Sequence, residues 1–348
     1  MPAGSLIVTC RAPIGKVAIA GVDLCTNQGC KTIVLKDLSE NGFLFYVLSV
    51  LSEKLNSIGS GTTFLELGSS ELKNFQVASP PIEEKILIAK FLDKKTTQID
   101  EAIAIKEQQI ALLKERKQII IQKAVTQGLD PTVPMKDSCV DWIGEIPAHW
   151  EVRRAKYLFD EVDERSESGE EELLSVSHMT GVTPRSEKNV SMFMAEDYSG
   201  SKLCREDDLV INIMWAWMGA LGVSERVGIV SPSYGVFRQK KRGTFNSVFL
   251  ELLLKSNYYV EYYNRVSTGL HSSRLRFYGH MLFAMEMGYP SYEEQNEIIA
   301  YLNDQTGKID LAVNSQVDQI AKLKEYKTTL INSAVTGKIR ITPDMVEA

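Results

Sequence analysis

The chain has 348 residues, of which 44% are hydrophobic and 24% charged, an ordinary composition for a globular protein with more than one domain. Its formal net charge of −6 excludes a basic field over the whole molecule, so nucleic-acid binding would require local patches. There is no membrane-spanning apolar run, no signal peptide and no CxxC pair among the five cysteines, which together predict a cytoplasmic protein with reduced thiols.

Residues 1–81 are predicted to form a β-rich domain. The apolar run at residues 6–8 and the alternation of apolar and small residues at 17–19 indicate short strands. Apolar side chains recur at helical spacing over residues 43–56, which predicts a helix. The proline pair at 80–81 ends this domain, because proline disfavours helix before it and suits the start of a helix.

Residues 82–141 are predicted to be a long helix followed by a linker. Within the helix, residues 97–126 carry apolar side chains at steps of four, three or seven, the heptad pattern of paired helices. At about 1.5 Å per residue this part alone would be roughly 45 Å long. One glycine and two prolines in residues 128–134 then predict an irregular linker.

Residues 142–290 are predicted to form a second β-rich domain, followed by a second long helix and a C-terminal tail at 291–348. The second domain repeats the first, since residues 209–211 match residues 6–8 and a later helical pattern recurs in the same order. Met1 corresponds to Cys204, so the 62 residues of 142–203 have no counterpart in the first domain. The first domain is therefore expected to be incomplete on its N-terminal side.

The two long helices repeat each other without a gap at a spacing of 210 residues. Glu83-Glu84 realigns with Glu293-Glu294, and residues 124–126 realign with residues 334–336. A register kept over so long a stretch indicates duplication. Duplication places two similar surfaces in one chain, which is typical of a recognition or spacing device.

Polar residues interrupt the apolar seam of both helices at the same two places. Lys106 and Lys117 stand in the first helix where Gln316 and Lys327 stand in the second. Matched interruptions predict that the helices pair with each other in a fixed register. The alternative is that each helix packs only on its own domain. The residues expected to form the seam are Ile99, Ile103, Ile110, Leu113, Ile120, Ile309, Val313, Ile320, Leu323 and Leu330.

Two sequence runs resemble a known family. These are Trp142-Ile-Gly-Glu-Ile-Pro-Ala-His-Trp150 and the preceding Ala124-Val-Thr-Gln-Gly-Leu-Asp-Pro-Thr-Val-Pro-Met-Lys-Asp. Both resemble the specificity subunit of type I restriction–modification enzymes, over nearly the whole chain. The resemblance implies an α+β fold in which two α/β target-recognition domains, the first incomplete, are separated by two long antiparallel helices that form a coiled-coil-like stem.

The resemblance also implies a function. Each recognition domain would read one half of a bipartite site on double-stranded DNA, and the helices would dock methyltransferase subunits and, through them, restriction subunits. Such a subunit has no catalytic residues, cofactor or metal of its own. The alternative is a truncated regulatory or assembly scaffold that binds methyltransferase subunits without reading DNA, and self-association of two chains is a further variant.

Two loops in each domain, matched between the domains by the repeat, and one basic run in the second domain are candidates for DNA contact. Arginine can hold guanine O6 and N7, and serine, threonine and histidine can serve bases or phosphates. The alternatives are an ordinary surface loop, buried core tryptophans and a solvated strand end. The candidates are Arg11, Lys16, Ser60, Thr62, Thr63, Trp215, Trp217, Arg238, Lys240, Lys241, Arg242, His271, Ser272, Arg274 and Arg276.

No catalytic motif competes with this interpretation. Gly15-Lys16 lacks the upstream glycine of a phosphate-binding loop, and no Asn/Asp-Pro-Pro-aromatic run of an adenine methyltransferase is present. The histidines are scattered, and Cys25 and Cys30 have no second pair with which to bind zinc. The sequence therefore predicts a binding protein and not an enzyme.

Overall fold

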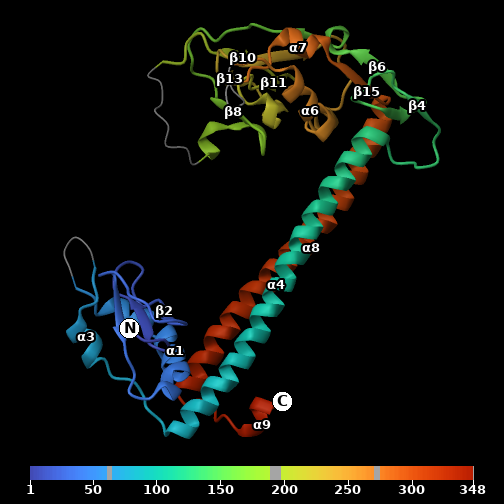
Figure 1. The fold of residues 1–348 in the computed structure, drawn as a ribbon. Coiled ribbons are helices and arrows are strands. Elements are labelled where there is room, and N and C mark those ends of the chain that lie inside the picture. Colours follow the sequence, from blue (N-terminus) through green and yellow to red (C-terminus); the bar gives the residue numbers. More distant parts are fainter. Residues whose placement is uncertain (61–64, 189–196, 270–274, 348) are drawn as a thin grey trace. The chain divides into compact units, whose positions relative to one another are not determined.

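The computed structural model of the chain is described over residues 1–60, 65–188, 197–269 and 275–347 (Figure 1). It combines short antiparallel strands with two long helices, which confirms the predicted mixed fold. Within these described ranges, no helix is both long and apolar enough to cross a lipid bilayer.

The chain divides into two compact units. Unit 1 is made of Met1–Leu112 with Ala312–Ala348, and unit 2 is Leu113–Leu311. The long helices α4 (Ile82–Gln127) and α8 (Tyr292–Val335) each contribute one part to each unit. Each unit therefore contains one strand-rich domain and a paired stretch of both helices.

Unit 1 contains a three-stranded antiparallel sheet in the order β2-β1-β3. Leu6 lies opposite both Ile19 and Ile33, so β1 is the central strand. The side chains of Leu6 and Val8 are fully buried beneath it. The elements are β1 (Leu6–Thr9), β2 (Val17–Ile19), β3 (Cys30–Ile33), η1 (Leu38–Glu40), α1 (Asn41–Val50), α2 (Ser52–Ser57), α3 (Ser69–Asn74) and α9 (Pro343–Glu347).

The single helix predicted over residues 43–56 is wrong, because the chain forms two helices, α1 and α2, on either side of Leu51. Leu51 has φ −97° and ψ 9°, outside the α-helical range. The spacing of apolar residues gave no sign of this break, because it continues from α1 into α2 and both helices bury apolar side chains. Phe43 and Val47 of α1 pack against Leu92 of α4.

Unit 2 contains a four-stranded sheet in the order β12-β11-β14-β7 and four two-stranded pairs. Leu209 lies between Val223 and Phe237, as Leu6 lies between its two partners in unit 1, so three of the four strands are the repeated ones. The linker predicted to be irregular contains β4, which pairs with β5. The strands are β4 (Met135–Asp137), β5 (Glu145–Pro147), β6 (Glu151–Arg154), β7 (Phe159–Glu161), β8 (Leu174–Ser177), β9 (Gly181–Pro184), β10 (Lys202–Cys204), β11 (Leu209–Ile211), β12 (Leu221–Val223), β13 (Gly228–Val230), β14 (Gly235–Gln239) and β15 (Glu286–Tyr289), and the helices are η2 (Ala155–Tyr157), η3 (Arg185–Glu187), η4 (Ala216–Met218), α5 (Ser247–Leu254), α6 (Asn257–Val266) and α7 (Gly279–Ala284).

Helices α4 and α8 pair in antiparallel orientation within each unit. In unit 1, Lys327 Nζ lies 2.6 Å from a carboxylate oxygen of Asp100, and in unit 2, Lys117 Nζ lies 2.7 Å from one of Asp310. The 210-residue repeat converts one ion pair into the other, so the matched seam lysines have matched partners. Among the predicted seam residues, Ile99, Ile103, Ile309, Ile320 and Leu330 are buried, and Ile110, Leu113, Ile120, Val313 and Leu323 are partly buried.

The first turn of each long helix is fastened to the N-terminus of a helix that follows the sheet. In unit 2, the fully buried Gln295 accepts the N–H of Asn246 at 2.8 Å, and its own amide donates to two backbone carbonyls. The repeat places Lys85 at this position in unit 1, where its Nζ lies 3.1 Å from Glu40. One copy thus uses neutral amides where the other uses an ion pair.

Candidate nucleic-acid interface

A tight turn after the central strand carries the first candidate loop in each unit. In unit 2, the buried Asn212 accepts the N–H of Met214 at 3.2 Å through its side-chain oxygen. Gly219 closes the turn at φ 78°, in the left-handed region that favours glycine. In unit 1, Thr9 takes the place of Asn212, because its hydroxyl oxygen accepts a hydrogen bond of 2.9 Å from the backbone N–H of Lys16. Both turns are therefore fixed by a polar side chain at the end of the strand.

A second loop lies beside this turn in unit 2. Thr268 and Arg276 exchange backbone hydrogen bonds of 3.2 and 2.8 Å, which closes the loop at its base. The N–H of Phe277 donates to the carbonyl of Ile213 at 3.0 Å and ties the loop to the turn. The tip of the loop, with candidates His271, Ser272 and Arg274, lies outside the described residues.

Unit 1 repeats this construction. Ser60 and Glu66 exchange backbone hydrogen bonds of 3.0 and 2.9 Å, and the N–H of Leu67 donates to the carbonyl of Cys10 at 2.9 Å. The guanidinium of Arg11 lies 3.2 Å from the Glu66 carboxylate, so the structure brings this candidate to the base of the loop. Candidates Thr62 and Thr63 lie outside the described residues. We call each turn with its loop a turn–loop site.

The two tryptophan candidates have different surroundings. Trp217 is anchored, because its indole N–H donates to the carbonyl of Met214 at 3.1 Å and its own carbonyl accepts from Asn264. Trp215 packs against it with ring centroids 5.8 Å apart and leaves 45% of its surface exposed. Trp215 therefore presents an aromatic ring to solvent from a rigid turn.

The basic run of β14 and the turn after it separates into internal and exposed members. Arg238 donates to both carboxylate oxygens of the buried Asp208 at 2.8 Å and to Glu164 at 2.9 Å. The hydrogen bond from Arg238, together with one from Arg205, holds the pKa of the Glu164 carboxyl below its usual range. Lys240 Nζ lies 3.2 Å from a carboxylate oxygen of Asp160. Arg242 is almost fully exposed, and its guanidinium is paired more loosely, 3.8 Å from a carboxylate oxygen of Asp207.

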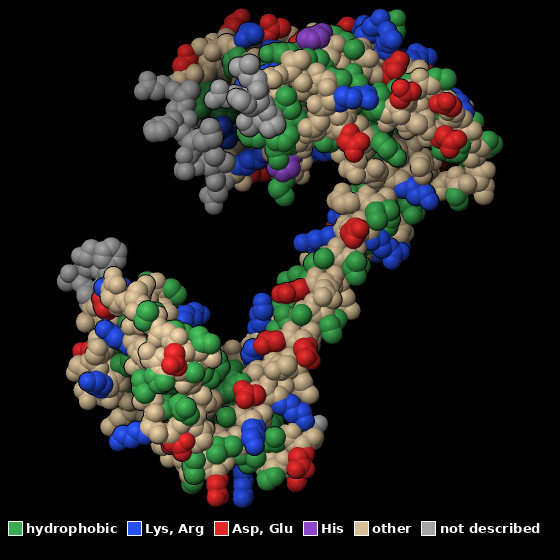
Figure 2. All heavy atoms as spheres, in the orientation of Figure 1, with side chains coloured by type: hydrophobic (Ala, Val, Ile, Leu, Met, Phe, Trp, Pro, Cys, Tyr) green, Lys and Arg blue, Asp and Glu red, His purple; other side chains and the backbone are tan. Residues whose placement is uncertain are grey.

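Exposed charge does not form one basic patch. Lys241 and Lys16 are exposed, as is Ser60 in unit 1, while Arg276 is partly buried and donates to the Leu275 carbonyl. On the face of each unit in view, Lys and Arg side chains are interspersed with Asp and Glu (Figure 2). Contact with a polyanion would therefore depend on a few cations at the turn–loop site and the basic run.

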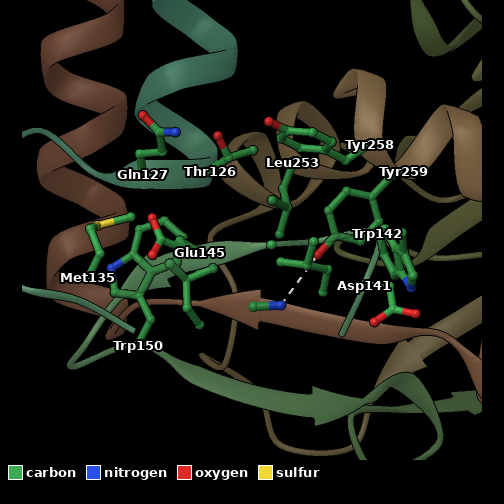
Figure 3. Close-up of a pocket in the computed structure, with 14 residues that line it drawn as sticks. Thr126, Gln127, Met135, Asp141, Trp142, Glu145, Trp150, Leu253, Tyr258 and Tyr259 are labelled. Carbon is green, nitrogen blue, oxygen red and sulfur yellow. Dashed lines mark hydrogen bonds between the residues drawn. The ribbon is translucent and has the colours of Figure 1, made fainter. Parts of the chain in front are cut away.

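The conspicuous run from Trp142 to Trp150 is structural. Trp150 is buried, and its indole N–H donates to Glu294 of α8 at 3.0 Å. Trp142 packs edge-on against Tyr259 with centroids 5.0 Å apart. The two tryptophans lie at opposite ends of a cleft of about 310 Å³ at the end of α4 (Figure 3). This run joins the strand-rich domain of unit 2 to the ends of the long helices.

No group of three or more His, Cys, Asp or Glu side chains suited to a metal ion occurs among the residues that the structure describes. His149, expected to be isolated, lies 2.7 Å from the carboxylate of Glu294. The sequence interpretation also missed Thr9 and Asn212. Their signal was available, since these polar residues hold the same place in the repeat, at the end of the central strand.

Comparison with known proteins shows what this chain is similar to. Residues 1–115 match the type I restriction modification DNA specificity domain. The chain is similar to the type I restriction enzyme MjaIX specificity subunit of Methanocaldococcus jannaschii, with 36% identity over 44% of this chain and 35% of that subunit. It is also similar to the MjaVIII specificity subunit of the same organism, with 26% identity over 89% of this chain and 72% of that subunit. The alignment with the first relative thus spans about a third of its length.

Two solved structures share the fold. One comes from work on complex assembly and conformational transition of the type I R-M system, with a TM-score of 0.70 at 16% identity over 96% of this chain and 82% of that chain. The other is the HsdS subunit from Thermoanaerobacter tengcongensis, with a TM-score of 0.57 at 18% identity over 97% of this chain and 82% of that chain. The matched domain over residues 1–115 and these relatives agree, and the chain is similar to the specificity subunits of type I restriction–modification enzymes.

Proposed function

We propose that this chain is the DNA-recognition subunit of a type I restriction–modification complex, acts in the cytoplasm on a bipartite double-stranded target, and has no catalytic site of its own. The duplicated turn–loop site carries the proposal. In both copies the same backbone hydrogen bonds hold a turn against a loop, a construction suited to presenting variable side chains from a rigid base. Two such sites in one chain suit a target in two parts.

In unit 2 the turn carries the exposed Trp215 and the base of the second loop carries the partly buried Arg276, so we assign base contact to this turn–loop site. Lys241 and Arg242 suit phosphates, because they are exposed and not held closely by carboxylates. Arg238 is assigned a supporting role, since its guanidinium is occupied by Asp208 and Glu164.

The long helices would space the half-site readers and dock methyltransferase subunits, through which restriction subunits would join. Supporting this, Ile105 and Leu112 of α4 lie seven residues apart, off the seam, and are 55% and 64% exposed. The repeat counterparts on α8 are Ser315 and Lys322, so at these two positions only α4 is apolar. An exposed apolar pair on a helix suits a partner protein.

The test is reconstitution with a methyltransferase subunit of a type I restriction–modification system from the same organism. In a gel mobility-shift experiment, the assembled complex is expected to bind selectively to DNA that carries one sequence motif. Genome-wide methylation mapping should show a bipartite motif that disappears when this gene is deleted. Assembly without sequence-selective binding and without such a motif would contradict DNA reading.

A second candidate is an assembly scaffold that binds methyltransferase subunits without reading a bipartite target. The turn–loop site of unit 1 favours it, because its one arginine, Arg11, is paired with Glu66 at the base of the loop. Under this function methyltransferase subunits would copurify with the chain, and the methylation map would lack any motif dependent on it.

A further inference from the structure

Asn212, the residue that follows β11, is hydrogen-bonded through its backbone and through both ends of its side chain. Its backbone N–H donates to the carbonyl of Ala220 at 3.0 Å, and its carbonyl accepts the N–H of Trp215 at 3.0 Å. Its side-chain oxygen accepts the N–H of Met214 at 3.2 Å, and its side-chain amide donates to the Tyr234 hydroxyl at 3.0 Å. The residue is only 5% exposed. Asn212 therefore closes the turn and ties it to a second part of unit 2.

Tyr234 connects this tie to the hydrophobic core. Its ring packs against a cluster of buried side chains that includes Val210 and Val236. Burial raises the pKa of the Tyr234 hydroxyl, which therefore stays neutral near pH 7. The N–H of Met214 can only donate, so it holds the side-chain oxygen of Asn212 toward the turn and leaves the amide nitrogen facing Tyr234. One orientation of the Asn212 side chain satisfies both neighbours.

The turn that Asn212 closes presents Trp215. The carbonyl of Trp215 accepts the N–H groups of Met218 at 2.9 Å and Ala220 at 3.2 Å, so its backbone is held on both sides. Its ring is 45% exposed and packs against Trp217. The direction of the exposed ring thus depends on the backbone of the turn, and Asn212 holds that backbone from inside the domain.

Unit 1 holds the matching turn by a different contact. The Thr9 hydroxyl accepts the N–H of Lys16 at 2.9 Å and donates to the carbonyl of Pro13 at 2.6 Å, both within the turn itself. The register of the central strand with its neighbour places Cys30 where unit 2 has Tyr234. The tie between the turn and a core tyrosine therefore belongs to unit 2.

We propose that Asn212 is a positioning residue for half-site specificity, which fixes the direction in which Trp215 meets the bases by holding the turn against Tyr234. The inference rests on the proposed function and deepens it, because it separates the residue that touches DNA from the residue that aims it. Without the Asn212 side chain the ring takes up more than one direction, and wrong base pairs bind almost as well as the right ones. Specificity is a difference between affinities, so it falls while overall binding persists.

The test compares binding of the assembled methyltransferase complex to its own target and to targets with single mismatches. Asn212→Leu keeps a similar volume and removes both side-chain hydrogen bonds. It should reduce discrimination within one half-site about tenfold, or about 1.4 kcal/mol. Discrimination in the other half-site and affinity for non-specific DNA should be unchanged, because neither depends on the direction of Trp215.

A second pair of variants separates positioning from stability. Tyr234→Phe removes only the hydroxyl that Asn212 contacts and should reduce the same discrimination about threefold. Tyr262→Phe is the matched control, since its buried hydroxyl donates to the carbonyl of Met281 and not to the turn, and it should leave discrimination intact.

Asn212→Asp is the rescue variant. Its carboxylate still accepts the N–H of Met214 and can accept the proton of the Tyr234 hydroxyl, so most of the discrimination should return even though a buried charge lowers stability. A wild-type complex without sequence preference would contradict the proposed function. A selective wild-type complex with equally selective Asn212→Leu and Tyr234→Phe variants, or discrimination that follows stability across the series, would overturn the positioning role alone.

Discussion

Arg238 and Arg242 lie four residues apart in one basic run, yet their surroundings differ completely. Arg238 neutralises Asp208, whose side chain is only 1% exposed, while the side chain of Arg242 is 91% exposed. Leaving a buried carboxylate without its cation destabilises the fold by far more free energy than an exposed ion pair contributes. Residue type alone therefore could not separate a structural arginine from a candidate for phosphate contact.

Replacement of Arg238 should destabilise unit 2. In Arg238→Gln the buried Asp208 carboxylate loses its charged partner, and we expect a loss of about 3 kcal/mol in the free energy of unfolding by urea denaturation. Arg205→Gln is the matched control, because Arg205 is exposed and also pairs with Glu164, and it should cost less than about 1 kcal/mol. Equal, small effects of both changes would show that folding does not depend on the pairing of Arg238 with Asp208.

The partner of Arg238 could not be predicted because it lies thirty residues away in sequence, in a turn with no pattern of its own. The turn–loop sites were predicted only as loops that matched in the repeat. The backbone hydrogen bonds that join Phe277 to Ile213, and Leu67 to Cys10, depend on tertiary packing and leave no mark on residue type. Trp150 was noticed as part of a family signature, but its role as a donor to Glu294 needed the fold.

At the scale of elements, periodicity predicted the long helices well, because heptad spacing and proline position are local properties. The break at Leu51 was missed, since no glycine or proline marks it and the apolar spacing continues through it. The seam lysines were predicted from their matched positions, but their partners Asp100 and Asp310 were identified only in the structure. Antiparallel pairing brings each aspartate to the lysine of the other helix.

The two helix ion pairs should be energetically equivalent. A double-mutant cycle of Asp100→Asn with Lys327→Met is expected to give a coupling energy of about 0.5 kcal/mol, because the pair is partly exposed. The cycle of Asp310→Asn with Lys117→Met is its repeat-related counterpart and should agree within error. A coupling at one pair and none at the other would contradict a shared register.

The exposed apolar pair on α4 gives a prediction about docking. Leu112→Lys copies the residue that the repeat has at position 322, and it should weaken methyltransferase binding about tenfold in a calorimetric titration. Thermal stability should be unchanged, because Leu112 is 64% exposed. Ser315→Lys on α8 is the control and should leave binding intact. Unchanged binding of Leu112→Lys would show that the docking surface does not include Leu112.

For the whole molecule, the charge of −6 means that DNA affinity must come from few cations against an unfavourable background. The assembled complex should bind less tightly as salt increases. Lys241→Ala and Arg242→Ala should each reduce the slope of log K against log salt by about 0.9. Lys240→Ala should have a smaller effect, because Lys240 is paired with Asp160. An unchanged slope in all three variants would exclude the basic run from the interface.

The fastening of α4 differs from that of α8 in a way that solvent can detect. Lys85 and Glu40 attract each other as charges, and dissolved ions weaken that attraction, whereas the neutral amide of Gln295 is indifferent to them. The two copies of the duplicated unit have therefore diverged in how strongly their stability depends on salt concentration. In concentrated salt we expect unit 1 to unfold at a lower temperature than unit 2. Thermal unfolding of the chain should then show two transitions.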